Sequence, residues 1–197
     1  MYQEKLVIGV TGTLCSGKGI VSKILLSKGC DIDTFSSIIR DELKSRGNSS
    51  PDRMQLQDEG NRLRKEFGSQ VIAQRLLLKY KDSVKPLVID GLRNIAELDY
   101  LRENSDFVLI GVDAPLDLRW NYTRNRKTSR DLMDYDEFVK LEARDRGHNE
   151  PLNGQQVDMC LAQADYLIYN DEEFKKLEDS RIYKQVLEIY EDVLKKR

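Results

Sequence analysis

The fold of this chain is decided by the stretch Gly9-Val10-Thr11-Gly12-Thr13-Leu14-Cys15-Ser16-Gly17-Lys18-Gly19. The stretch follows a short apolar run, Leu6-Val7-Ile8, and precedes a segment with the pattern of a helix. A glycine, four residues and Gly-Lys between a strand and a helix are typical of a phosphate-binding loop. The glycines let successive backbone N–H groups point at phosphate oxygens, and the helix N-terminus adds to the attraction. Lys18 would supply a mobile positive charge.

The last position of the loop departs from this pattern. A Ser or Thr normally follows the lysine and ligates magnesium through its hydroxyl, whereas Gly19 has no side-chain oxygen. Thr13, Ser16 or a water could take the place of that hydroxyl. The alternative interpretation is a glycine-rich turn that binds nothing.

Length and charge exclude several classes of protein. The 197 residues are enough for one α/β domain over residues 1–197, and not for two independent domains. Hydrophobic residues make up 40% and charged residues 34%, and the net charge of −2 gives no reason to expect a nucleic-acid partner. No apolar run approaches the ~20 residues of a membrane span, so no membrane partner is expected. Both a monomer and a homodimer remain open.

The cysteines and the histidine limit the chemistry. Cys15, Cys30 and Cys160 are odd in number and widely spaced, which suits reduced thiols in the cytoplasm better than a disulfide framework. His148 is the one histidine and no Cys-x-x-Cys pair occurs, so zinc chemistry is nearly excluded. We expect His148 on a loop surface, because phosphoryl transfer relies more on position and charge than on proton abstraction.

Polar residues after the second predicted strand indicate a substrate site. Cys30 to Asp33 has the pattern of a short strand, and Ile38 to Lys44 that of a helix. In a doubly wound sheet the carboxyl ends of the strands face the ligand crevice, so we expect Asp33, Ser36 and Arg40 to meet the substrate. The alternative is that Asp33 and Ser36 only cap the helix.

Two helices are predicted next. The segment from Arg53 to Phe67 is amphipathic and is closed by Gly68, and Ser69 is expected to cap the following helix. Arg62 belongs to a basic group on the first of these helices, and we assign it to the acceptor. The alternative is a solvated charged face, the commoner fate of such a group.

The segment from Pro86 to Arg93 is the second stretch, after the loop, that indicates a phosphate site. Its apolar run ends in Asp90 at the carboxyl end of a predicted strand, like a Walker B carboxylate, which would hold magnesium directly or through water. Arg93 follows on the loop where its forked donors could hold a second phosphate-bearing substrate. The alternative for Arg93 is a salt bridge to the next helix, Asn94 to Asn104.

The middle of the chain predicts a buried strand and then a lid. Phe107 to Asp113 is continuously apolar, which is typical of a parallel sheet covered on both faces. A helix from Pro115, a short basic loop and a further helix follow, and they suit a lid over about residues 119–150 that excludes water from the transferring group. The basic residues of this region are Arg119, Arg124, Arg126, Lys127 and Arg130.

The C-terminal part predicts three more elements. Gly154 to Ala164 has the pattern of a helix, Ala164 to Asn170 that of a fifth strand, and Phe174 to Val193 that of an amphipathic helix packed on the sheet. Asn170 could line the edge of a purine or cap the last helix.

Several segments together resemble the P-loop kinase-like domain that some deoxycytidylate deaminase-family proteins carry at their N-terminus. These segments are the loop ending in Gly17-Lys18-Gly19, Ile38 to Glu42, Leu56 to Gly68, Val88 to Asn94, Val112 to Pro115 and Gly154 to Val157. The order of motifs is also similar, more distantly, to nucleoside monophosphate kinases and dephospho-CoA kinases. The deaminase half itself, with its His-x-Glu and Cys-x-x-Cys zinc site, has no counterpart.

The resemblance implies an α/β P-loop NTPase fold, with a five-stranded parallel sheet flanked by helices and a helical lid. It implies a nucleoside triphosphate and a second, nucleotide-like ligand. Our leading hypothesis is a nucleotide kinase that moves the γ-phosphoryl group of ATP, with Mg²⁺, to a nucleoside or deoxynucleoside monophosphate. The alternatives are a dephospho-CoA kinase and a nucleotide-binding sensor with little or no transfer activity, which Gly19 favours.

The hypothesis gives each candidate residue a role. The donor is assigned to Gly12, Thr13, Leu14, Cys15, Ser16, Gly17, Lys18, Gly19, Ile20 and Asn170. The transferring group is assigned to Lys18, Arg119, Arg124 and Arg126, with Asp90 holding magnesium. The acceptor is assigned to Asp33, Ser36, Arg40, Arg62 and Arg93.

Overall fold

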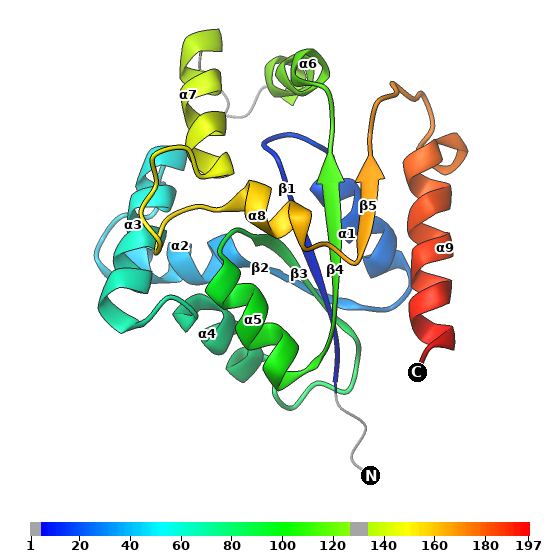
Figure 1. Ribbon diagram of the computed structural model, residues 1–197, viewed down its shortest axis with the longest axis horizontal. Helices are drawn as coiled ribbons and strands as arrows, with labels where there is room; N and C mark the ends of the chain where they lie inside the picture. The colour runs from blue at the N-terminus through cyan, green and yellow to red at the C-terminus, as the bar shows by residue number, and fades with distance from the viewer. Residues whose placement is uncertain (1–4, 127–133) are drawn as a thin grey trace.

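Five parallel strands form the central sheet of the computed structural model, which describes residues 5–126 and 134–197 (Figure 1). Their order across the sheet is β2-β3-β1-β4-β5, and each neighbouring pair is parallel. The strands are β1 Leu6–Gly12, β2 Asp31–Thr34, β3 Leu87–Leu92, β4 Asp106–Asp113 and β5 Tyr166–Tyr169. The α/β fold with a five-stranded parallel sheet is thereby confirmed.

Strand β1, which precedes the phosphate-binding loop, is the middle strand of the sheet. Every residue of β1 is buried, because β3 and β4 flank it and helices cover both faces. Gly9 is required here, since a Cβ atom at this position would lie 2.5 Å from the ring of Phe107. The carboxyl end of β1 therefore emerges at the centre of the sheet edge, where parallel sheets bind their ligands.

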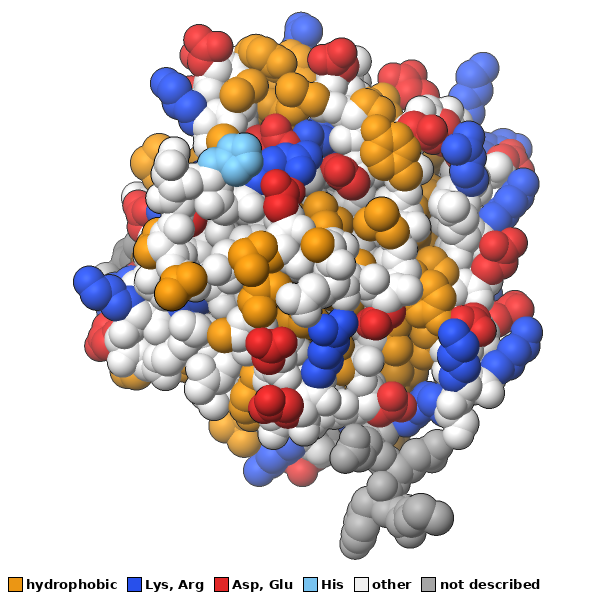
Figure 2. Space-filling model, viewed as in Figure 1, with side chains coloured by type: hydrophobic (Ala, Val, Ile, Leu, Met, Phe, Trp, Pro, Cys, Tyr) orange, Lys and Arg blue, Asp and Glu red, His pale blue; other side chains and the backbone are white. Residues whose placement is uncertain are grey.

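Helices pack on the sheet in two layers. One face is covered by α1 and α9, and the other by α2, α3, α4, α5 and α8. The helices are α1 Lys18–Ser27, α2 Phe35–Ser45, α3 Arg53–Phe67, α4 Val71–Lys79, α5 Ile95–Asn104, α6 Leu116–Arg126, α7 Tyr135–Arg146, α8 Val157–Ala162 and α9 Arg181–Lys195, with the 3-10 helix η2 at Leu177–Asp179. Charged side chains of both signs are interspersed over the face shown in Figure 2.

Three helix boundaries differ from the sequence expectation. Helix α8 begins at Val157 rather than at Gly154, because the preceding backbone is held by Asn94, whose Nδ2 donates to Leu152 O and Gly154 O. The cap position of α4 is Gln70 rather than Ser69, with no side-chain cap bond. The last helix begins at Arg181, because the hydroxyl of Ser180 accepts from the backbone N–H of Tyr183 and caps it.

Helices α6 and α7 stand beyond the carboxyl ends of the strands (Figure 1). They correspond to the predicted lid of about residues 119–150. Phe138 of α7 is fully buried in a small core with Leu14 and Cys15, against which Trp120 of α6 packs. The tip of the predicted lid, including Lys127 and Arg130, lies outside the described residues.

Candidate functional site

The loop between β1 and α1 has backbone angles that only glycine adopts easily. Gly12 has a φ of 149° and Gly17 a φ of 110°. A Cβ atom would lie 2.0 Å from Val112 O at Gly12 and 2.8 Å from Asn170 Nδ2 at Gly17. Both glycines are therefore needed for the loop to curl and to lie close to its neighbours.

Side chains from β4, β5 and α6 brace this loop from outside. The hydroxyl of Thr13 donates to Asp113 Oδ1 over 2.7 Å, and Asn170 Nδ2 donates to Ser16 O over 3.0 Å. Arg119 Nη1 donates to Leu14 O over 3.2 Å. The loop is thus held in its curled shape by protein partners, which is the pre-organisation an anion site requires.

Asn170 is buried directly after β5, beside the loop. It does not cap α9, because the cap of that helix is Ser180. Its amide Nδ2 donates to Ser16 O, and it is not among the residues that line the two cavities next to the loop. Its assignment to the donor stays a prediction.

Lys18 lies inside the loop. Its Nζ donates to Gly12 O over 2.8 Å and to Thr13 O over 2.7 Å. Burial lowers the pKa of Lys18 to about 8, against the opposing charge of Asp90 and with a further contribution from the positive charge of Arg93. An ammonium group that is buried but near its titration point gains strongly when phosphate oxygens approach it.

A cavity of about 240 Å³ opens between the loop, the start of α2 and the start of α3. It brings together four predicted residues outside the loop, which are Ser36, Arg40, Asp90 and Arg93. The loop contributes Leu14, Cys15, Ser16, Gly17, Lys18 and Gly19, and the cavity is completed by Thr34, Arg53 and Gly91. The loop and these four predicted residues therefore line one cavity.

Sequence reasoning missed Arg53 and Thr34 as pocket residues. Arg53 is the first residue of α3, after the N-cap Asp52, and Thr34 is the N-cap of α2. The available signal was positional, because both residues stand where a helix begins beside the carboxyl ends of the strands. Thr34, rather than Asp33 or Ser36, caps α2 by accepting from Ser37 N.

Two predicted acceptor residues lie elsewhere. Asp33 Oδ2 accepts from Lys79 Nζ over 2.6 Å and ties β2 to α4. Burial opposes the ionisation of Asp33, but the hydrogen bonds from Lys79, Ser37 and the Thr34 backbone, with the charge of Lys79, together outweigh burial and lower the pKa of Asp33. Arg62 forms ion pairs with Glu42, Glu59 and Glu66 along α2 and α3. Neither lines the cavity, because the neighbouring helices supply partners that sequence spacing does not reveal.

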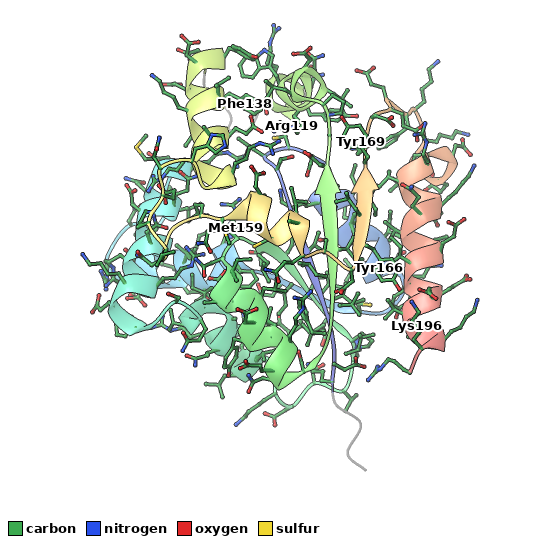
Figure 3. All side chains as sticks on the ribbon, viewed as in Figure 1. Arg119, Phe138, Met159, Tyr166, Tyr169 and Lys196 are labelled. Atoms are coloured by element: carbon green, nitrogen blue, oxygen red, sulfur yellow. The ribbon has the colours of Figure 1, made fainter. Side chains whose placement is uncertain are left out.

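The three arginines assigned to the lid differ in where the structure places them. Arg119 is buried, and its guanidinium donates to Ala114 O, Leu14 O and Glu142 Oε1. In Figure 3 it lies with Phe138 in the region between α6 and α7. Arg124 is exposed on α6. The side chain of Arg126 lies outside the described part of the structure.

A second cavity of about 260 Å³ lies on the α6 side of the loop. It is lined by Cys15, Gly17, Ile20, Tyr122, Asn125 and Phe174. Tyr122 also joins α6 to the segment after β5, since its hydroxyl donates to Glu172 O over 3.2 Å. Two aromatic side chains and an amide beside the loop offer stacking and hydrogen bonding to a flat ring.

The residues of the first cavity fit a magnesium ion bound together with phosphates. Mg²⁺ in such sites takes one or two carboxylates, phosphate oxygens and several waters, so Asp90 alone is a sufficient protein carboxylate. Within residues 5–126 and 134–197 no group of three or more His, Cys, Asp or Glu residues could hold a metal by itself. A Cβ atom at Gly19 would have no atom within 4 Å, so the position of the missing hydroxyl is open space.

Comparison with known proteins places the chain among P-loop proteins. The profile of the AAA_18 family, described as an AAA domain, matches residues 8–145. Over 171 residues the chain is 31% identical to a UPF0200 protein of Methanothermobacter thermautotrophicus, a match that covers 84% of this chain and 82% of that protein. Among the helices of the described residues, none is long and apolar enough to cross a membrane.

Solved structures share the fold. The shikimate kinase of Bacteroides thetaiotaomicron has a TM-score of 0.58 and 14% identity, covering 96% of this chain and 98% of that one. The shikimate kinase of Acinetobacter baumannii, solved in complex with shikimate, has a TM-score of 0.57 and 14% identity, covering 100% and 97%. These neighbours confirm the P-loop kinase fold. The resemblance to domains fused to deaminases stays a prediction.

Proposed function

We propose that this chain, which belongs to the AAA_18 family of AAA domains and to the UPF0200 family, is an ATP-dependent phosphotransferase. It moves the γ-phosphoryl group of ATP to a nucleoside or deoxynucleoside monophosphate. The observation that carries the proposal is one cavity in which Lys18 and Asp90 meet Arg40, Arg53 and Arg93. A phosphate-binding loop and a set of guanidinium groups that line one cavity suit two phosphate-bearing ligands.

The donor end uses the loop and the second cavity. Backbone N–H groups of the loop and Lys18 would hold the β- and γ-phosphates, with Lys18 following the charge as it develops. The cavity beside Tyr122 and Phe174 lies on the other side of Gly17, at a suitable place for the adenine ring. Both cavities are lined by Cys15 and Gly17, so a single extended nucleotide can occupy them together.

The acceptor end is built for an anion. Arginine is the side chain best suited to bidentate contacts with phosphate, and Arg40, Arg53 and Arg93 reach the cavity from α2, α3 and the loop after β3. Thr34 and Ser36 add hydroxyl groups at the same edge. We assign the phosphate of the acceptor to these arginines, with Arg53 in the place that sequence reasoning gave to Arg62.

Asp90 would hold magnesium, directly or through water. When bound, Mg²⁺ supplies neutralisation of the charge that develops on the transferring group. Arg124 and Arg126 remain the lid residues assigned to that group. Arg119 instead stabilises the shape of the loop, because its Nε, Nη1 and Nη2 each donate to a protein oxygen. Such an enzyme would act in the cytoplasm, where its three thiols stay reduced.

The test is an assay of ADP release from ATP and Mg²⁺ with a panel of acceptors. The panel holds the ribo- and deoxyribonucleoside monophosphates, dephospho-CoA and shikimate. We expect acceptor-dependent ADP with at least one monophosphate, and a fall of about 100-fold or more in turnover for Lys18→Ala. Lys23→Ala is the matched control, because Lys23 is exposed on the same helix, and it should keep wild-type turnover.

Gly19 supports a second candidate, a nucleotide-binding sensor without transfer activity. A Cβ at Gly19 would have no atom within 4 Å, so no described side chain takes over the space of the usual hydroxyl. Binding of ADP or ATP without any acceptor-dependent ADP release would favour the sensor. Turnover with dephospho-CoA alone would favour the other kinase, and ordinary turnover by Lys18→Ala would remove Lys18 from the mechanism.

A further inference from the structure

Arg93 is held by the last helix of the predicted lid and by the segment after it. Its guanidinium Nη2 lies 3.4 Å from Asp145 Oδ2, at the end of α7. Its carbonyl oxygen accepts from Gln156 N over 2.6 Å. Sequence reasoning expected a salt bridge to the adjoining helix α5 as the alternative role, but the partner comes from α7 instead. The side chain and the backbone of Arg93 are therefore both positioned by residues 145–156.

Asp145 is a buried carboxylate with partners on two sides. Only 1% of the residue is exposed. Its Oδ1 accepts from Gln57 Nε2 of α3 over 2.5 Å, while its Oδ2 faces Arg93. Gln57 is itself buried. One carboxylate thus joins α7, α3 and the cavity arginine, and its negative charge also acts on Lys18.

The geometry limits what Arg93 can do. Among the side chains that the structure describes, Asp145 supplies the ion pair of Arg93, and Arg93 Nε is buried without a hydrogen-bond partner. A guanidinium group is planar, so a carboxylate on one edge sets the direction of the others. Because Asp145 is buried and bonded to Gln57, its position depends on how α7 packs against α3.

We propose that Asp145 is a positioning residue for the acceptor site, acting through Arg93. It rests on the proposed function in that Arg93 is taken to hold the acceptor phosphate. It adds that acceptor affinity depends on the one ion pair between Asp145 and Arg93, which links α7 of the predicted lid, and Gln57 of α3, to the cavity. This unit is distinct from the other contacts between α7 and α3. The same α7 is joined to α6 by Arg119 and Glu142, which connects this unit to the donor loop through Leu14 O.

The experiment measures anion binding in the full chain by calorimetry. The protein is first saturated with ADP, which fills the donor loop, and inorganic phosphate is then titrated. Asp145→Asn removes the charge but keeps an oxygen for Gln57. We expect it to weaken phosphate binding about tenfold, as the loss of a charge-assisted bond predicts, while the affinity for ADP changes by less than about twofold.

Asp58→Asn is the matched control. Asp58 accepts from Arg144 Nη2 over 2.8 Å and is another tie between α3 and α7, but it does not touch Arg93. This variant should leave phosphate and ADP binding unchanged. Equal effects of the two variants, or an equal loss of phosphate and ADP binding in Asp145→Asn, would overturn the proposal in favour of a merely structural role.

A double-mutant cycle tests whether Asp145 acts through Arg93. In the Arg93→Lys background, Asp145→Asn should have little further effect on phosphate binding, whereas a full additional tenfold loss contradicts the proposal. Asp145→Glu keeps the charge one methylene away and is the second variant if Asp145→Asn does not fold. It should bind phosphate between wild type and Asp145→Asn, and wild-type affinity in this variant would count against a positional role.

The two proposals fail separately. If the ADP-filled wild type binds no phosphate, there is no anion site for Arg93 to serve and this inference falls. If phosphate binding responds as expected but no acceptor supports turnover, the proposed function falls and the positioning role stands. Where turnover is found, Asp145→Asn should raise the KM of the acceptor about tenfold and leave the KM of ATP nearly unchanged.

Discussion

Arg119 and Glu142 form a buried ion pair, with 2.5 Å between Nη2 and Oε1, that joins α6 to α7. The same guanidinium donates to Leu14 O in the phosphate-binding loop. Sequence reasoning assigned Arg119 to the transferring phosphoryl group. Its burial and its three protein acceptors, Ala114 O, Leu14 O and Glu142 Oε1, support our proposal that it stabilises the shape of the loop instead.

Removal of Arg119 should therefore unfold the protein more easily. Arg119→Ala leaves buried Glu142 with Arg146 as its remaining cationic partner, so the free energy of unfolding should fall by about 3 kcal/mol, the lower end of the cost of breaking a buried pair. Urea denaturation measures the change. Arg124→Ala is the control, because Arg124 is exposed on the same helix, and it should stay within about 0.5 kcal/mol of wild type. Equal stability of the two variants would contradict the role assigned to Arg119.

Nucleotide affinity should depend on pH through Lys18. Its pKa is lowered to about 8 by burial, so the ammonium form is lost as the pH rises through 8. Phosphates favour the charged form, so binding takes up a proton above this pH and affinity falls by up to about tenfold per pH unit. Calorimetry with ADP from about pH 7 to about pH 9.5 measures it, with Lys18→Arg as a charge-preserving control.

The control separates Lys18 from other groups in that titration. Arginine stays protonated throughout the range, so Lys18→Arg should bind ADP with a flat pH profile even if its affinity is lower. A fall of the same slope in Lys18→Arg would assign the pH dependence to another residue.

Gly19→Ser should leave the fold stable and should lower the Mg²⁺ concentration that nucleotide binding requires. A Cβ at this position meets no atom within 4 Å, and serine is the better helix former by about 0.5 kcal/mol. The added hydroxyl stands where a magnesium ligand is usual, so the concentration of Mg²⁺ needed for half-maximal ADP or ATP binding should drop several-fold. Thermal unfolding and Mg²⁺ titrations measure the two effects.

Gly17→Ala is the matched contrast for this variant. Its Cβ would lie 2.8 Å from Asn170 Nδ2 at a φ of 110°, so both stability and nucleotide binding should be lost. An unchanged Mg²⁺ requirement in Gly19→Ser would show that the metal is held away from this side of the loop.

Substitution of Arg53 and substitution of Arg62 should have different effects on the KM of the acceptor. Arg53→Ala removes a guanidinium from the cavity and should raise the KM of the acceptor about tenfold or more, whereas the KM of ATP should change little. Arg62→Ala breaks only ion pairs with Glu42, Glu59 and Glu66, and both KM values should stay near wild type. The reverse result would return Arg62 to the acceptor site.

Much of the fold was predictable because its signals are local. The apolar runs indicated all five strands, and the segment from Arg53 to Phe67 was predicted with the bounds that the structure shows. Boundaries failed where a distant residue supplies the partner. The side-chain amide of Asn94, for example, donates to the backbone oxygens of Leu152 and Gly154, and α8 begins only at Val157.

For the candidate site, too, local signals were predictive and partners from distant segments were not. Ser36, Arg40, Asp90 and Arg93 were correctly placed at one cavity, since the carboxyl ends of neighbouring parallel strands must meet. Asp33 and Arg62 were not, because Lys79 and three glutamates reach them from other helices. Arg53 was missed because its place at the cavity depends on where α3 begins in space.

The sequence by itself determined the phosphate-binding loop, the parallel sheet behind it and the carboxylate at Asp90. These follow from backbone chemistry, from the period of apolar residues and from the edge at which parallel strands end. Only the tertiary structure decided which charged side chains line the cavity and which form ion pairs with one another. Partner choice depends on distances between helices that are far apart in the chain, as Arg119 with Glu142 and Arg93 with Asp145 show.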